Sequence, residues 1–131
     1  KLVAVMMPFN GSFANTFDSI NNACKDVGLE CKKANDIWEN STFIQDIFEL
    51  IFTSKIVIGD FTGKNPNVFY ELGLAHALNK EVILLTQDIN DVPFDLRHFR
   101  IIVYQDSISG ADKLKSTLKD FINEQINGKK K

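Results

Sequence analysis

Short apolar runs alternate with amphipathic helical patterns along nearly the whole chain, and this alternation restricts the fold more than any other feature. Apolar runs typical of strands lie at residues 2–7, 55–60, 81–86 and 101–104, and a shorter strand is predicted at residues 29–34. Helical spacing of apolar residues is found at residues 13–27, 42–52, 67–78 and 111–126. Several of these strands are apolar without interruption, which is typical of a parallel sheet buried on both faces.

Strict alternation of this kind predicts parallel strands, joined by right-handed crossovers, with helices on both faces. We therefore predict an α/β fold: a three-layer, flavodoxin-like, doubly wound domain with a five-stranded parallel sheet in the order 2-1-3-4-5. A chain of 131 residues fits one domain, which we place at residues 1–127, followed by a basic tail at 128–131. Because the sequence opens at Lys1, we expect it to be part of a longer protein.

Local signals predict where several elements begin and end. Ser12 is a plausible N-cap for the first helix, and Gly28 follows the end of that helix. The segment 35–41 is polar, contains the single Trp, and is predicted to be a loop. The segment 92–97 is predicted to be a loop with a short helical turn.

Composition and charge exclude several classes of function. A net charge of -2 and a pI near 5.6 argue against a nucleic-acid partner, because nucleic-acid binding usually requires a basic face. No apolar run is long enough to span a membrane, so we expect a cytoplasmic protein without a membrane partner. Cys24 and Cys31 have no neighbouring ligands in sequence that would complete a metal set. We expect no metal and no cofactor.

The predicted strand order places a ligand site at the carboxyl ends of the first and third strands, where ligands bind in folds of this kind. The residues that reach this edge are Pro8 to Ser12 and Asp60 to Asn67. Gly63 and Pro66 allow a tight loop there, and Asn67 is a candidate cap for the next helix. Free amides at that helix start would suit a phosphate or a polar sugar.

Two carboxylates in this region each have two interpretations. Glu71 lies about one turn into the predicted helix, where it would either interact with the helix dipole or serve as a fixed catalytic group. Gly73 and Ala75 would let the helix lie close to the sheet and hold Glu71 in place. Asp60 would either contact a ligand or cap a neighbouring loop.

Three sequence motifs together resemble the nucleoside 2-deoxyribosyltransferase-like group, which is related in fold to TIR domains. They are Met7-Pro8-Phe9, Val57-Ile58-Gly59-Asp60 with Asn65-Pro66-Asn67, and Tyr70-Glu71-Leu72-Gly73-Leu74-Ala75-His76-Ala77. The resemblance extends through most of the chain, and the glutamate-containing helix is its most specific part. It implies cleavage of an N-glycosidic bond in a nucleoside, a nucleotide or NAD.

The resemblance also implies roles for individual residues. Glu71 would be the catalytic glutamate, attacking the anomeric carbon or stabilising its positive charge. Asp60 and Asn67 would hold sugar hydroxyls, and the amides of Gly11 and Ser12 would hold any phosphate. The remaining expected substrate-binding residues, which include aromatic walls for the base, are Pro8, Phe9, Trp38, Asn65 and Tyr70.

One departure from the family pattern concerns the acid that assists the leaving base. The family usually carries a second acidic residue ahead of the glutamate, where this chain has Asn65. Asp36, Glu39 and Asp95 are the alternatives at the same edge, and hydrolysis is favoured over transfer. A nucleotide-sensing module or a TIR-like self-association module in a defence or signalling protein is the alternative function. In either case, the resemblance favours a homo-oligomer.

Overall fold

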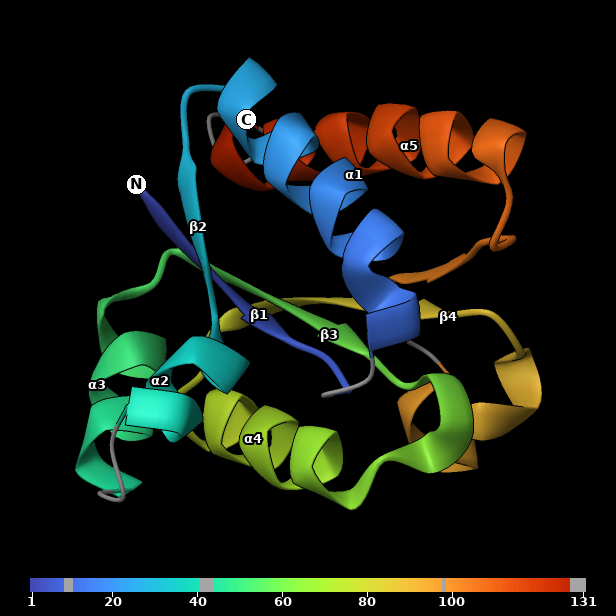
Figure 1. The fold of residues 1–131 in the computed structure, drawn as a ribbon. Coiled ribbons are helices and arrows are strands. Elements are labelled where there is room, and N and C mark those ends of the chain that lie inside the picture. Colours follow the sequence, from blue (N-terminus) through green and yellow to red (C-terminus); the bar gives the residue numbers. More distant parts are fainter. Residues whose placement is uncertain (9–10, 41–43, 98, 128–131) are drawn as a thin grey trace.

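The computed structural model describes residues 1–8, 11–40, 44–97 and 99–127, with only the backbone described at 38–40. A five-stranded parallel sheet forms its centre, in the order β2-β1-β3-β4-β5 (Figure 1). The strands are β1 (Leu2–Met6), β2 (Glu30–Lys33), β3 (Ile56–Asp60), β4 (Glu81–Thr86) and β5 (Ile101–Val103). The predicted fold and strand order are confirmed.

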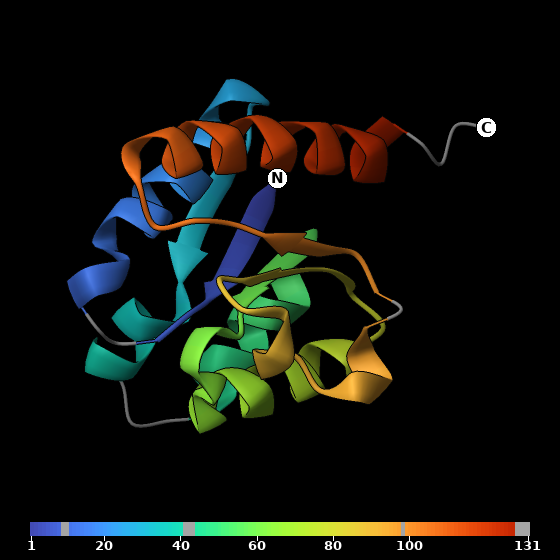
Figure 2. The same ribbon diagram turned by 90° about the vertical axis from the view of Figure 1, so that its right-hand side faces the viewer.

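Five helices cover the two faces of the sheet, which makes three layers (Figure 2). Helices α1 (Ala14–Asp26) and α5 (Ile108–Asn127) pack together over one face. Helices α2 (Ala34–Asn40), α3 (Ile44–Thr53) and α4 (Pro66–Ala77) cover the other. Each face has its own apolar core. The strands β1, β3 and β4 are buried on both sides, as their uninterrupted apolar runs predict, whereas the edge strands β2 and β5 are partly exposed.

Two of the local predictions are wrong and two are confirmed, one of which is the short helical turn within residues 92–97, at Phe94–Leu96. Residues 34–40 form helix α2, where the polar sequence predicted a loop; Ala34 of this helix is fully buried. Ser12 does not cap α1, because a 3₁₀ turn, Gly11–Phe13, precedes the helix and Phe13 occupies the cap position. Gly28 has a φ of 80° just beyond the end of α1, as expected for a glycine that terminates a helix.

Helix α4 lies close to the sheet because of a glycine in the strand and not because of the one in the helix. A Cβ atom on Gly59 of β3 would overlap the Leu72 side chain, whereas Gly73 is exposed and has open space around its Cβ position. Ala75 is fully buried against the sheet, as predicted. The close approach that the sequence analysis assigned to Gly73 is therefore made by Gly59.

Membrane-spanning helices and clusters of metal-binding side chains are both absent from the described ranges. None of the described helices is both long enough and apolar enough to cross a membrane. Across the same residues, no group of three or more His, Cys, Asp or Glu side chains could hold a metal ion. Cys24 is a buried free thiol, and Cys31 is a half-buried one. The basic tail at 128–131 lies outside the described residues.

Candidate functional site

A crevice lies at the carboxyl ends of the central strands, where the strand order predicts a ligand site. Its volume is about 650 Å³. Three of the predicted residues, Pro8, Ser12 and Asn65, line it. The other described residues that line it are Phe13, Thr62, Gly63, Pro66, Gln87 and Asp106. The wall of the crevice thus comes from the segments that follow β1, β3, β4 and β5.

The loop between β3 and α4 is shaped by two consecutive residues in the left-handed region. Gly63 has a φ of 76° and Lys64 a φ of 57°, and the glycine adopts this conformation without the steric cost that a side chain adds. The Asn65 side chain then caps α4 by accepting hydrogen bonds from the backbone N–H groups of Asn67 and Val68, at 2.9 and 3.4 Å. The predicted cap at Asn67 is therefore wrong: Asn65 is the cap, and Pro66 occupies the first helical position, where proline is favoured.

Hydrogen bonds connect this loop to the segment that follows β4. The hydroxyl of Thr62 accepts from the backbone N–H of Gln87 at 3.0 Å. The N–H of Gly63 donates to the Asp91 carboxylate at 2.8 Å, which joins the loop to the 3₁₀ turn Ile89–Asp91. The crevice wall is therefore fixed by bonds between segments far apart in the sequence.

Asp60 is 1% exposed at the end of β3, and both of its carboxylate oxygens accept hydrogen bonds from the protein. Oδ1 accepts from the backbone N–H of Thr62 at 2.9 Å, and Oδ2 accepts from the Tyr104 hydroxyl. Burial raises the pKa of Asp60 above its ordinary value, against the lowering effect of these hydrogen bonds. The bond to Thr62 is the loop-capping role that the sequence analysis gave as one of two alternatives.

Tyr104 connects Asp60 to the other face of the sheet. Its hydroxyl lies 3.4 Å from the Thr16 hydroxyl of α1 and 3.2 Å from Nε2 of Gln87. Burial, followed by the charge of Asp60, raises the pKa of Tyr104 well above its ordinary value, so the hydroxyl keeps its proton. Tyr104 can therefore act as a permanent donor to the buried carboxyl group.

Glu71 lies on the face of α4 that packs against the sheet and is 3% exposed. It shares this face with Val68, Leu72 and Ala75, which are all apolar and buried. Glu71 is five residues after Pro66, so it lies roughly 7.5 Å along the helix axis from the residue that lines the crevice. A carboxyl group is thus held on an apolar helix face beside the crevice, while Glu71 is not among the residues that line its walls.

The other predicted site residues fall into two groups. Gly11 and Asn67 are exposed in the segments that border the crevice, and Tyr70 is 57% exposed on α4; none of these three lines the crevice. Phe9 and the side chain of Trp38 fall outside the described residues. The aromatic walls that the resemblance implies for the base therefore remain predictions.

The crevice contains one acidic lining residue that the sequence analysis missed. Asp36 and Asp95, two of the candidate acids, are exposed and do not line the crevice, and the side chain of Glu39 is outside the described part. Asp106 does line it. Its position three residues after β5 was the available signal, because the segment after each parallel strand reaches the same edge of the sheet.

Comparison with known proteins adds information on the fold. No family model matches the chain, and no curated protein matches it in sequence. A 2-deoxyribosyltransferase from Bacillus psychrosaccharolyticus superimposes with a TM-score of 0.68 and 13% identity, over 92% of this chain and 91% of that one. The 2-deoxyribosyltransferase from Leishmania mexicana gives a TM-score of 0.55 and 18% identity, over 67% of this chain and 65% of that one.

Another similar structure is a CMP N-glycosidase from Clostridium botulinum, with a TM-score of 0.61 and 16% identity over 90% of this chain and 98% of that one. A flavodoxin-like domain from Synechococcus has the same TM-score, 0.61, at 13% identity over 95% of this chain and 99% of that one. The chain has the fold of these proteins. At such low identity the likeness establishes the fold, and the chemistry has to be argued from the residues at the site.

Proposed function

We propose that this protein cleaves the N-glycosidic bond between a base and its sugar, with Glu71 as the catalytic carboxylate. The observation that carries this proposal is the position of Glu71, which is 3% exposed on an apolar helix face beside the crevice. Carboxyl groups held in buried positions near a crevice are candidates for catalytic groups. The shared fold with 2-deoxyribosyltransferases and a CMP N-glycosidase supports the same function.

In the proposed reaction the bond from the anomeric carbon to the base nitrogen breaks, and its electron pair leaves with the base. Glu71 would form a bond to that carbon or stabilise its positive charge. The oxygen of a water molecule would then bond to the carbon, displacing any bond to Glu71, and the proton that the water loses would go to the base. Asn65, at the place of the family's second acidic residue, cannot supply a proton to the base. We therefore favour hydrolysis over transfer to a second base.

The test is release of free base from a panel of deoxynucleosides, nucleoside monophosphates and NAD, followed by chromatography. The wild-type protein is expected to release base from one substrate class, and Glu71→Gln is expected to release none above background while it unfolds at the same temperature. Glu30→Gln makes the same chemical change at an exposed position, at the start of β2 and away from the carboxyl edge of the sheet, and should keep full activity. Equal release by the wild type and Glu71→Gln would refute the assignment of Glu71.

Self-association is the second candidate function, and one surface supports it. Helix α3 exposes Ile44, Phe48 and Phe52, which are 37%, 43% and 66% accessible and are spaced four residues apart on one side of the helix. Exposed apolar stripes of this kind often mark interaction surfaces. We expect light scattering to show a homo-oligomer that Phe48→Glu weakens. Assembly without any base release would favour a TIR-like interaction module or a nucleotide sensor.

A further inference from the structure

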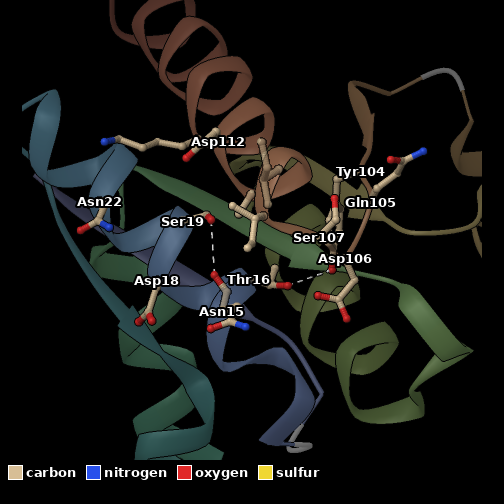
Figure 3. A pocket seen from close by; sticks show the side chains of 14 residues that line it. Asn15, Thr16, Asp18, Ser19, Asn22, Tyr104, Gln105, Asp106, Ser107 and Asp112 are labelled. Carbon is tan, nitrogen blue, oxygen red and sulfur yellow. Dashed lines mark hydrogen bonds between the residues drawn. The ribbon is translucent and has the colours of Figure 1, made fainter.

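A second cavity adjoins the crevice and shares one residue with it. This cavity has a volume of about 480 Å³ and lies between α1 and α5, on the opposite face of the sheet from α4 (Figure 3). Residues from α1, including Asn15, Thr16 and Ser19, line one side of it, and Tyr104 to Ser107 line another. Asp106 lines both cavities and therefore marks the point where they meet.

The charges around this junction are mostly negative. The charged residues that line the two cavities are Asp18, Asp106, Asp112 and Lys115. The ammonium group of Lys115 lies 3.3 Å from the carboxylate of Asp26, a residue outside the cavities that also lies 3.4 Å from the ammonium group of Lys119. Three carboxylates thus face one paired cation within the described lining.

The side chains of the neighbouring segments that the structure describes add no further charge to this lining. In the segment that follows β1, Phe9 and Asn10 lie outside the described residues, and neither side chain can carry a positive charge. Lys64 belongs to the neighbouring loop but is exposed and does not line the crevice. The helix starts at this edge carry partial positive charges of about half a unit each, whereas Asp106 carries a full negative charge.

We propose that the carboxylate of Asp106 determines substrate specificity by repelling phosphate, so that the crevice takes neutral nucleosides and rejects nucleoside monophosphates and NAD. This inference rests on the proposed glycosidase function of the same site. A phosphate close to the exposed carboxylate of Asp106 is repelled by its like charge. Repulsive elements of this kind contribute to the rejection of a wrong ligand. The amides of Gly11 and Ser12, expected to hold a phosphate, are then left to hold sugar hydroxyls.

The first test compares kcat/KM for a deoxynucleoside and for its 5′-monophosphate in the wild type and in Asp106→Asn. The substitution keeps the size of the side chain and removes its charge, and it should shift the ratio towards the monophosphate by about tenfold. Asp120→Asn makes the same change at an exposed position of α5 that lines neither cavity, and it should leave the ratio unchanged. A wild type that prefers the monophosphate, or an unchanged ratio in Asp106→Asn, would overturn the inference.

Ionic strength gives a readout that a merely structural role of Asp106 would not change. Added salt screens charge repulsion, so the wild type should discriminate less against the monophosphate at high salt. Asp106→Asn should show little further change. Discrimination that does not depend on salt in the wild type would contradict a role through charge.

Calorimetric titration with Glu71→Gln separates this inference from the proposed function. Tighter binding of the nucleoside than of its monophosphate, without turnover by the wild type, would support the specificity and refute the glycosidase. Turnover of both ligands with equal kcat/KM would support the glycosidase and refute the specificity. If neither ligand binds or reacts, both proposals fail.

Discussion

Asp60 and Glu71 are both almost completely buried near the same edge of the sheet, with exposures of 1% and 3%, yet they belong to different surroundings. Asp60 ends a strand, and its two oxygens accept hydrogen bonds from Thr62 and Tyr104, which belong to the segments that close the crevice. Glu71 lies on a helix face whose other members, Val68, Leu72 and Ala75, form part of an apolar core. One carboxyl group is surrounded by the loop framework, and the other by packing residues.

This difference shows that burial at the carboxyl edge of a parallel sheet does not by itself identify a catalytic group. The hydrogen bonds of Asp60 fix the loop after β3 and connect this loop to α1 through Tyr104. This structural role accounts for the burial of Asp60. Glu71 lies on the buried face of α4, and there the comparison with known folds and not a loop contact suggests its role. We therefore expect substitutions of Asp60 and its partners to change mainly stability, and substitutions of Glu71 to change mainly activity.

The largest expected effect is on catalysis at Glu71. In Glu71→Gln we expect kcat/KM for base release to fall by about 10³-fold, because removing a charged catalytic group commonly costs that much. Urea unfolding should change little, because glutamine has nearly the same volume. Steady-state kinetics and urea titration of the same preparations test this contrast. If Glu71→Gln strongly lowers the unfolding free energy as well as the activity, then Glu71 is a structural residue, as Asp60 is.

The next largest effect is expected where helix α4 touches the sheet. Gly59→Ala places a methyl group against the Leu72 side chain, and overpacking of this kind costs about 1–3 kcal/mol of unfolding free energy. It should also lower kcat/KM, because α4 carries Glu71. A double-mutant cycle with Leu72→Ala should show a favourable coupling between the two substitutions. Strictly additive effects would show that the two residues do not clash.

A comparable loss of stability without a large loss of activity is expected at Tyr104. In Tyr104→Phe, Oδ2 of Asp60 loses its donor inside the protein, and an unsatisfied buried acceptor costs about 1–3 kcal/mol. Chemical denaturation measures the loss, and Tyr70→Phe, at an exposed position, is the matched control. If kcat/KM falls by a large factor while the folded protein remains the main species, then the Tyr104–Asp60 pair takes part in the reaction.

The smallest effect concerns the dependence of stability on pH. The pKa of Asp60 is raised in the folded protein, so the folded state holds this proton more tightly than the unfolded state does. The stability that this group contributes is complete below its pKa in the unfolded chain, about 3.9. It is lost as the pH rises through the pKa of Asp60 in the folded protein. The wild-type unfolding free energy should therefore decrease over that window relative to Asp60→Asn. If the unfolding free energies of the two proteins depend on pH in the same way, the raised pKa of Asp60 is contradicted.

Predictions from the sequence succeeded where the signal was local and repeated. Uninterrupted apolar strands and helical periodicity depend on burial of a whole face, so they identified five strands in the correct order. The errors occurred where one or two residues decide the outcome. The sequence favoured Ser12 and Asn67 as helix caps, whereas the backbone places Phe13 and Asn65 there. Pro66 was an overlooked sign of the second cap, since proline favours the first helical position.

The sequence by itself determined the layers of this protein, the strand order, the edge at which its crevice lies and the helix that carries Glu71. Only the tertiary structure decided that Asp60 bonds to Tyr104, 44 residues away, and that Asp106 lies where two cavities meet. Periodicity is set by neighbours along one helix or strand. Hydrogen-bond partners and cavity walls are set by segments that meet only when the sheet has formed, and no local pattern specifies their distances.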